Sequence, residues 1–267
     1  MLQVATTGSG ERLAAGRWSV VGASSVVRDG SGVTGEAPAF VVSLVELPSG
    51  DALVGTGGPG LGVVGADSGG WRALDGFDGV DRSDWYSPQG DAPDVFAVAA
   101  TDDAWFAAVH VGGLWRSGDS GSTWEQVVPT KADVHHVAAA SDGVVVVAAA
   151  AGVAVSTDGG RTFGPWRTDG IDHTYCTAVA RVGDRLVVGS SRGPFGDTAL
   201  YEGRVDGGPF ARTGTELPAV EPVHARDLLA VDGERVVFAA GSTVWSSGGD
   251  GWSVLAELDA PVVAVGS

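Results

Sequence analysis

Lysine is almost absent from the sequence. Lys131 is the single lysine, so fifteen of the sixteen basic residues are arginines. There are 33 acidic residues, which give a formal net charge of −17. A lysine-poor acidic surface is typical of proteins in concentrated salt, where ions screen the repulsion between carboxylates. We therefore predict a halophilic protein, with an ordinary acidic protein as the alternative. No nucleic-acid partner is expected, because no basic stripe is present to neutralise phosphates.

Cysteine and long apolar segments are also scarce. Cys176 is the only cysteine, which argues against a disulfide framework and a thiolate metal site and favours a buried, inert thiol. No apolar run approaches the roughly 20 residues of a membrane-spanning helix, so no membrane association is expected. The start of the chain, Met1–Val4, lacks a basic segment followed by an apolar one. We therefore expect no secretion signal and a cytoplasmic location.

Glycine, in contrast, is abundant. The chain has 43 glycines, and hydrophobic residues make up 44% of it. Many glycines among short apolar runs favour short strands joined by tight turns, with enough apolar residues for a full core. The length suits one large all-β domain, and we expect a single domain over residues 1–267.

One eight-residue motif occurs twice, at Ser117–Trp124 and at Ser156–Phe163. Both copies read S-x-D-x-G-x-T followed by Trp or Phe. The pattern predicts a tight hairpin turn, because Ser and Asp side chains bond nearby backbone N–H groups and Gly adopts a positive φ. The closing aromatic is expected to pack under the turn. The residues with predicted structural roles are Ser117, Asp119, Gly121, Trp124, Ser156, Asp158, Gly160 and Phe163.

This motif resembles the Asp-box, or BNR, repeat of β-propellers such as sialidases, sortilin-type receptors and photosystem II assembly factors. Together with the charge, the resemblance suggests a halophilic archaeal member of that group. It implies a β-propeller fold. It implies little about function, because Asp-box turns are structural elements in those families.

The repeat spacing predicts the number of blades. Six aromatics that close a turn recur every 39 to 53 residues, and a four-stranded blade takes about 40–50 residues. They are Trp18, Trp71, Trp124, Phe163, Phe210 and Trp252. Each unit is interpreted as strands A to D, with the Asp-box turn between C and D. Residues 2–7 and 261–265 are predicted to complete one closing blade from both termini, because closure removes exposed sheet edges. We predict six antiparallel four-stranded blades, with five or seven as alternatives.

The two longest connections between blades are predicted at 22–39 and at Gly76–Pro93, both on the rim that forms the channel mouth. The second contains Arg82, Trp85 and Tyr86. An exposed aromatic pair beside an arginine suits stacking on a sugar or a peptide. The alternative is a solvated loop whose aromatics cap the core.

The histidines are also predicted to lie near this rim, in a B–C hairpin or at the start of A strands. Their side chains are expected to line a polar mouth, either as a ligand site or as a channel filled by water. No H-x-H or H-x-x-x-H spacing supports a metal held by His and Asp, so no metal or cofactor is expected. The predicted mouth residues beyond the loop are His110, His135, His136, His173, Tyr175, Arg192, His224 and Arg226.

Two functions remain open from the sequence. We predict a non-catalytic propeller that acts as a monomer and holds an unknown protein or small-molecule ligand at the mouth. The alternative is a glycan-binding or sialidase-like propeller, which the resemblance would associate with three arginines, a tyrosine–acid pair and an Arg-Ile-Pro segment. That segment is absent. The residues from which such a site would be built are Arg82, Arg192, Arg226, Tyr175 and Asp227.

Overall fold

The computed structural model describes most of the chain. The described residues are 3–6, 11–88, 90–194, 196–215, 217–218, 220, 229–232, 234–248 and 251–266, with the backbone alone described at 3–6, 11–14, 232 and 263–266. Of the predicted mouth residues, His224 and Arg226 lie outside these ranges, as does Asp227.

The described part is all-β, with antiparallel pairing throughout. Five sheets have four strands, one has three and one has two. The first two four-stranded sheets are β2 (Glu11–Ala15), β3 (Trp18–Val21), β4 (Ser25–Arg28), β5 (Thr34–Glu36), and β6 (Val41–Glu46), β7 (Ala52–Thr56), β8 (Leu61–Val64), β9 (Trp71–Ala73). The third and the three-stranded sheet are β10 (Val95–Ala100), β11 (Trp105–Val109), β12 (Gly113–Ser117), β13 (Glu125–Val128), and β14 (Val134–Ala139), β15 (Val145–Ala149), β16 (Gly152–Ser156).

The remaining sheets complete the chain. They are β17 (Tyr175–Val182), β18 (Arg185–Ser191), β19 (Ala199–Arg204), β20 (Gly207–Thr213), then β21 (Leu229–Asp232), β22 (Arg235–Ala240), β23 (Thr243–Gly248), β24 (Gly251–Glu257), and the pair β1 (Gln3–Thr6) with β25 (Val262–Gly266). Two short helices interrupt the connections, α1 (Asp75–Asp78) and the 3₁₀ turn η1 (Thr130–Ala132).

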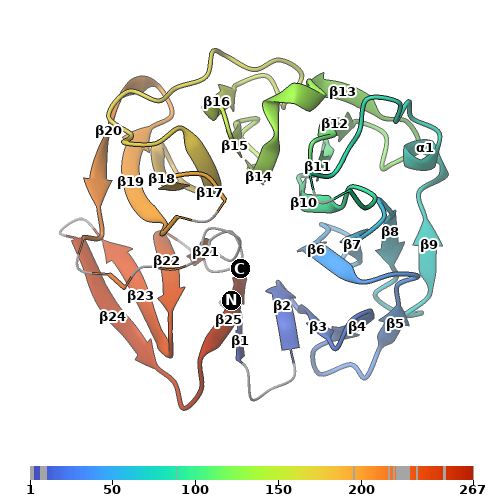
Figure 1. The fold of residues 1–267 in the computed structure, drawn as a ribbon. Helices are drawn as coiled ribbons and strands as arrows, with labels where there is room; N and C mark the ends of the chain where they lie inside the picture. The colour runs from blue at the N-terminus through green and yellow to red at the C-terminus, as the bar shows by residue number, and fades with distance from the viewer. Residues whose placement is uncertain are drawn as a thin grey trace.

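The sheets are arranged in a ring around a central axis, as Figure 1 shows. The first strand of each larger sheet lies nearest the centre, and the first strands of successive sheets contact one another. Each sheet then runs outward strand by strand to the rim of the ring. The connections between sheets and the turns between second and third strands consequently lie on one rim, called the mouth here. The turns between first and second strands and between third and fourth strands lie on the opposite rim, called the turn face.

The hydrophobic core is divided among the gaps between sheets. Four clusters of buried side chains each join two successive sheets, and a fifth joins the last two four-stranded sheets and also includes Val262 of β25. The second strands are buried along almost their whole length, as in β7 and β15. A strand covered on both faces requires a continuous apolar run rather than an alternating one. The apolar runs of the sequence at 53–56, 105–108, 144–147, 186–189 and 236–239 coincide with these second strands.

The N-terminal unit differs from the prediction. Trp18 begins the second strand of a sheet instead of closing a turn before a fourth strand. Its buried indole Nε1 donates a hydrogen bond to Gly50 O at 3.0 Å in the next sheet. The predicted connection at 22–39 was wrong, because it contains β4 and β5. These strands are only four and three residues long, and the segment is rich in Gly and Ser, so its apolar signal is weak.

The unit that closes on Phe163 lacks the predicted fourth strand. After the turn, the chain makes one isolated bridge, between Val153 and Arg167. Pro165 lies in this segment and has no N–H to donate to a ladder, which explains why pairing does not continue.

The two termini pair with each other, as the sequence predicts. β1 and β25 are antiparallel neighbours, with Val4 opposite Val265. The pair lies between β22 and β2 in Figure 1. The pair forms a two-stranded sheet and does not continue into β2, which belongs to the next sheet. The blade count and the manner of closure remain predictions.

Candidate functional site

The first strands share one irregularity at their mouth ends. In β6, β10, β14 and β17, the pairing register with the second strand slips by one residue near the start. A β-bulge of this kind leaves one residue unpaired and redirects its side chain. The extra residues are Val42, Phe96, His135 and Thr177. The bulges thus present one side chain per sheet at equivalent positions near the channel.

Aromatic rings gather around two of these bulge residues. Phe96 stacks on His110, with ring centroids 4.9 Å apart and planes 17° apart. The Phe96 ring also contacts the His135 ring in a T-shaped arrangement, with centroids 6.4 Å apart. Tyr175, at the start of β17, packs on His135 with centroids 4.4 Å apart. Three successive sheets therefore contribute rings to one group, and Asp133 lies beside the ring of His135. We call these residues the mouth cluster: Phe96, His110, Asp133, His135 and Tyr175.

The polar centre of the mouth cluster is only partly satisfied. The buried His135 places Nδ1 2.7 Å from Cys176 O, so Nδ1 carries the proton, because a carbonyl only accepts. Its Nε2 lies 3.4 Å from Asp133 Oδ2, an ion-pair distance without hydrogen-bond geometry. Asp133 Oδ1 is also buried and, within the described part of the chain, has no hydrogen-bond partner. A buried polar atom without a partner is costly, so such an atom indicates a site for a water molecule or a ligand.

The electrostatics of the mouth cluster favour a charged Asp133. Burial acts to raise the pKa of this carboxyl, but contact with His135, electrostatic interaction with His135 and His110, and the Val111 N–H outweigh it and hold the pKa below its usual range. Burial, helped by the Asp133 charge, raises the pKa of Tyr175 to about 12. Tyr175 is therefore a neutral phenol near neutral pH, and not a ready nucleophile.

Backbone conformation positions Asp133. Its φ is +53°, in the left-handed region, directly after η1. Asp tolerates this region better than most residues. The Asp133 carbonyl also accepts a hydrogen bond from Ala150 N at 3.1 Å, which ties the position to the second-to-third-strand turn of its sheet.

The loop residues predicted at the mouth mostly pack against the core. Trp85 is half-buried and contacts Phe77 at 5.9 Å and Trp115 at 5.7 Å between ring centroids. Arg82 donates to Phe77 O at 2.9 Å and pairs with Asp78 at 3.1 Å, with its guanidinium over the Trp85 ring. This supports the interpretation of Trp85 as a cap on the core. Tyr86 alone projects outward, with 58% of its surface exposed.

The other predicted residues do not join the mouth cluster through any described contact. His136 Nδ1 accepts a hydrogen bond from Val179 N at 3.1 Å, which connects β14 to β17. His173 is half-buried, and its carbonyl accepts a hydrogen bond from Ser190 Oγ. Arg192 is exposed just after β18. Phe96 was not among the predicted mouth residues, because the register slip that presents it has no signature in residue type.

On the turn face, the first eight-residue turn forms a closed hydrogen-bond network. Ser117 Oγ donates to Asp119 Oδ1 at 2.8 Å and accepts from Gly121 N at 2.8 Å. The Asp119 carboxylate accepts the N–H and the hydroxyl of Thr123, at 2.8 and 2.7 Å. Gly121 has φ +85°, and its carbonyl accepts the indole N–H of Trp124 at 3.1 Å. These bonds hold the pKa of Asp119 below its usual range, with the Thr123 N–H contributing most.

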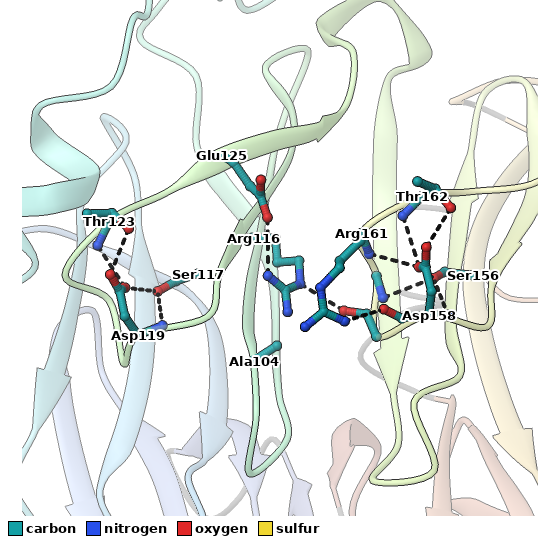
Figure 2. Close-up of polar contacts among 12 residues, drawn as sticks. Ala104, Arg116, Ser117, Asp119, Thr123, Glu125, Ser156, Asp158, Arg161 and Thr162 are labelled. Carbon is teal, nitrogen blue, oxygen red and sulfur yellow. Dashed lines mark hydrogen bonds and ion pairs between the residues drawn. The ribbon is translucent and has the colours of Figure 1, made fainter.

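The second turn repeats this network, and Figure 2 shows both. Ser156 Oγ donates to Asp158 Oδ1 at 2.7 Å and accepts from Gly160 N at 2.9 Å. The Asp158 carboxylate accepts the hydroxyl and the N–H of Thr162, and also the N–H of Arg161 at 3.0 Å. The pKa of Asp158 is well below its usual range, chiefly because of the Thr162 hydroxyl.

Arginines connect neighbouring sheets on the turn face. Their guanidinium groups bond mainly backbone carbonyls or a carboxylate of the adjacent sheet. The bonds are Arg28 to Ala66 O (3.0 Å), Arg116 to Gly159 O (2.8 Å), Arg167 to Arg204 O (2.7 Å), Arg181 to Asp142 (2.6 Å) and Arg185 to Ser247 Oγ. The planar, multi-donor guanidinium suits these contacts better than a lysine ammonium.

Two recesses open on the turn face. One, of about 610 Å³, lies between the sheets of β10–β13 and β14–β16 and includes Asp103, Arg116, Ser141, Asp158 and Arg161 in its lining. The other, of about 580 Å³, lies where the first turns of three successive sheets meet, at Asp142, Arg181 and Glu234. The sequence predicts a ligand site on the opposite rim only.

No metal site is apparent among the described residues, because no three His, Cys, Asp or Glu side chains gather closely enough. The lone Cys176 is buried, and burial raises the pKa of its thiol to about 12, so it is not a thiolate at neutral pH. Within the described ranges, no helix is long and apolar enough to cross a membrane.

The fold resembles that of solved β-propellers. PorZ, an essential surface component of the type-IX secretion system of Porphyromonas gingivalis, matches with a TM-score of 0.67 and 11% identity over 100% of this chain and 35% of PorZ. Virginiamycin B lyase of Staphylococcus aureus matches with a TM-score of 0.66 and 12% identity over 95% of this chain and 87% of the lyase. An ancestral GH74 enzyme matches with a TM-score of 0.61 and 15% identity over 96% of this chain but only 39% of the enzyme.

No protein-family model matches the chain, and no curated protein matches it in sequence. At identities this low, the structural likeness shows the β-propeller fold alone. Function must therefore be argued from the residues of this chain.

Proposed function

We propose that this chain is a non-catalytic β-propeller that holds a protein or small-molecule ligand at its channel mouth. The observation that carries the proposal is the mouth cluster, in which a buried carboxylate oxygen of Asp133 lacks a donor. In the same cluster, the ring of His135 contacts the rings of Phe96 and Tyr175.

The chemistry of the cluster suggests which group it binds. A charged carboxylate oxygen only accepts hydrogen bonds, so its partner must donate one. Aromatic faces favour a cation or an apolar C–H surface. An ammonium, an amide or a sugar hydroxyl meets both conditions, whether it comes from a small molecule or from a protein side chain.

The glycan-processing alternative receives less support. It needs three arginines around one carboxylate-binding pocket together with a tyrosine–acid pair. Arg82 is paired with Asp78 in its own loop, and Arg192 is exposed beyond β18 with no described contact to Tyr175. The likeness to the GH74 enzyme concerns the fold and covers a minor part of that protein.

Further features of the proposal rest on the sequence. We infer a six-bladed propeller over a single domain, residues 1–267, with the β1–β25 pair as the closing piece. The two complete turn networks support membership of the Asp-box (BNR) group. The charge of −17 with one lysine supports a halophilic protein. A cytoplasmic, monomeric state is part of the same proposal.

The binding proposal can be tested with Asp133→Asn. Asn also tolerates a positive φ, so the backbone is preserved while the charge is removed. The melting temperature would be measured against L-lysine, L-arginine, D-glucose and D-galactose at constant ionic strength. At least one probe should stabilise the wild type, with its affinity about tenfold or more weaker in Asp133→Asn, as expected for a lost hydrogen bond to a charged group.

Asp84→Asn is the matched control, because Asp84 is exposed in the loop after α1. It should bind the same probe as the wild type does. Equal binding by wild type and Asp133→Asn would contradict the proposed site. If all probes fail, a pull-down with wild type and Tyr86→Ala tests the protein partner, and equal recovery of every protein would contradict a partner that uses this rim.

A further inference from the structure

Arg161 on the turn face lacks an acidic partner, and Arg28 and Arg167, which bond backbone carbonyls, likewise form no described ion pair. Arg161 is exposed, and among the described residues its guanidinium makes a single hydrogen bond, from Nη1 to Asp158 O at 2.6 Å. No described carboxylate lies within ion-pair distance of it, although the chain carries twice as many acidic as basic residues. The nearby Asp158 carboxylate is instead occupied by its own turn.

A second guanidinium lies next to it. Arg116, with only 7% of its side chain exposed, donates from Nε to Gly159 O at 2.8 Å. The two arginines therefore bond consecutive carbonyls, those of Asp158 and Gly159, and Figure 2 shows both side chains between the two turns. Arg116 also pairs with the exposed Glu125 at 3.1 Å, which only partly offsets the two adjacent positive charges.

Both arginines line the same recess of about 610 Å³ between two sheets. Ser141, Thr157 and Gly118 also line it, as do the acidic residues Asp103 and Asp158, of which Asp158 is bonded within its own turn. Gly118 lies close to the guanidinium, since a Cβ placed there would be 3.2 Å from Arg116 Nη1. The site thus combines a buried guanidinium held in place by a carbonyl and an exposed guanidinium in a space large enough for a small ligand.

We propose that this recess binds an oxyanion, either a carboxylate or a phosphate group, between Arg161 and Arg116. Two planar guanidinium groups match the geometry of such oxygens and form charge-assisted hydrogen bonds with them. The recess lies on the rim opposite the mouth cluster, so this site is separate from the proposed function and does not depend on it.

The experiment is an NMR titration of the arginine Nε–H signals in the full chain. Sodium phosphate is one arm and sodium acetate the other, with KCl keeping the ionic strength constant. The Arg161 and Arg116 signals should shift to saturation in at least one arm. A response to phosphate alone assigns a phosphate site, and a response to acetate alone assigns a carboxylate site.

Arg161→Gln should weaken that binding about tenfold or more, because one charge-assisted interaction is lost. Arg72→Gln is the matched control, since Arg72 is exposed on β9, away from the recess. It removes the same charge and should leave the affinity unchanged. Because Arg161 is exposed, its variant is expected to fold, which the melting temperature checks.

Three results would overturn the proposal. One is the absence of saturable shifts in both arms. Another is an equal shift of Arg72 and Arg161, which would mean that the anion is not bound specifically. The third is binding to Arg161→Gln with the affinity of the wild type.

Discussion

The two rims of the ring differ in how their polar groups are satisfied. On the turn face, Asp119 and Asp158 each accept several hydrogen bonds from their own turns, and arginines bridge to the next sheet. At the mouth, Asp133 and His135 keep buried atoms without a hydrogen bond in the described structure. Saturated polar groups stabilise a fold, whereas unsaturated ones await a partner. Two arginines of the turn face depart from this pattern in the described structure: Arg181 Nε is buried without a hydrogen bond, and the exposed Arg161, which has no acidic partner, gives this face a candidate site.

The largest effect is expected from substitutions in the second turn. Gly160→Ala places a Cβ 2.3 Å from the buried ring of Phe106, at φ +75°. We expect it to lower the free energy of unfolding by roughly 3 kcal/mol, and the melting temperature by about 6–12 °C. Gly159→Ala has a similar φ, but its new Cβ meets only the flexible end of Arg161. It should cost about 1 kcal/mol. Equal losses in the two variants, measured by thermal unfolding, would contradict the packing of the turn on Phe106.

A smaller change in stability is expected when a carboxylate loses its charge, and its sign should differ between a carboxylate in an ion pair and an exposed one. Asp142→Asn on the turn face breaks a bidentate contact with Arg181, whose side chain is only 9% exposed. We expect a loss of about 1 kcal/mol, since Asp142 itself is half exposed to solvent. Asp84→Asn at the mouth removes the same charge from an exposed position and should raise the melting temperature slightly in dilute salt.

The repulsion between carboxylates should also make the stability of the whole protein depend on salt concentration. The melting temperature of the wild type should fall by a few degrees from molar to millimolar KCl, because less-screened carboxylates repel. The gain from Asp84→Asn should vanish in molar KCl. A wild-type melting temperature that does not depend on salt would contradict the halophilic interpretation.

The smallest effect concerns the titration of Tyr175. Burial first, and then the Asp133 charge, raise its pKa to about 12. Since the unfolded value is about 10, the native state keeps the proton that the unfolded state loses, and stability falls as pH rises from about 10 towards 12. Asp133→Asn should lower the Tyr175 pKa by a fraction of a unit while leaving it above the ordinary value. Tyrosinate absorbance measures this, with Tyr175→Phe to identify the signal. An unchanged pKa in Asp133→Asn would contradict the coupling.

The sequence predicts those parts of the fold whose packing leaves a plain pattern. Second strands buried on both faces must be apolar throughout, so runs such as Val144–Val147 were recognisable. β4 and β5 were missed because strands of four and three residues beside Gly-rich turns show no such run. Trp18 was wrongly predicted to close a turn, because the sequence does not distinguish such a tryptophan from one whose indole packs between sheets.

The mouth was predictable only in outline. The sequence placed His135 and Tyr175 near the starts of neighbouring first strands, and the structure brings their rings together. The bulge that presents Phe96 depends on a one-residue register slip, which has no signature in residue type. The pairing of Arg82 with Asp78 was equally hidden, because a loop containing several acids offers many equivalent partners.

The pairing of β1 with β25 has a consequence for how the protein is made. Residues 3–6 leave the ribosome before their partners at 262–266, which are synthesised about 260 residues later. At roughly 5–20 residues per second, the first strand waits about 15–50 seconds for its neighbour. During synthesis, the growing ring therefore presents an open strand edge to other nascent chains. Joining the two ends by a short linker and opening the chain at a mouth loop would let these strands form a local hairpin, which should speed the last step of folding.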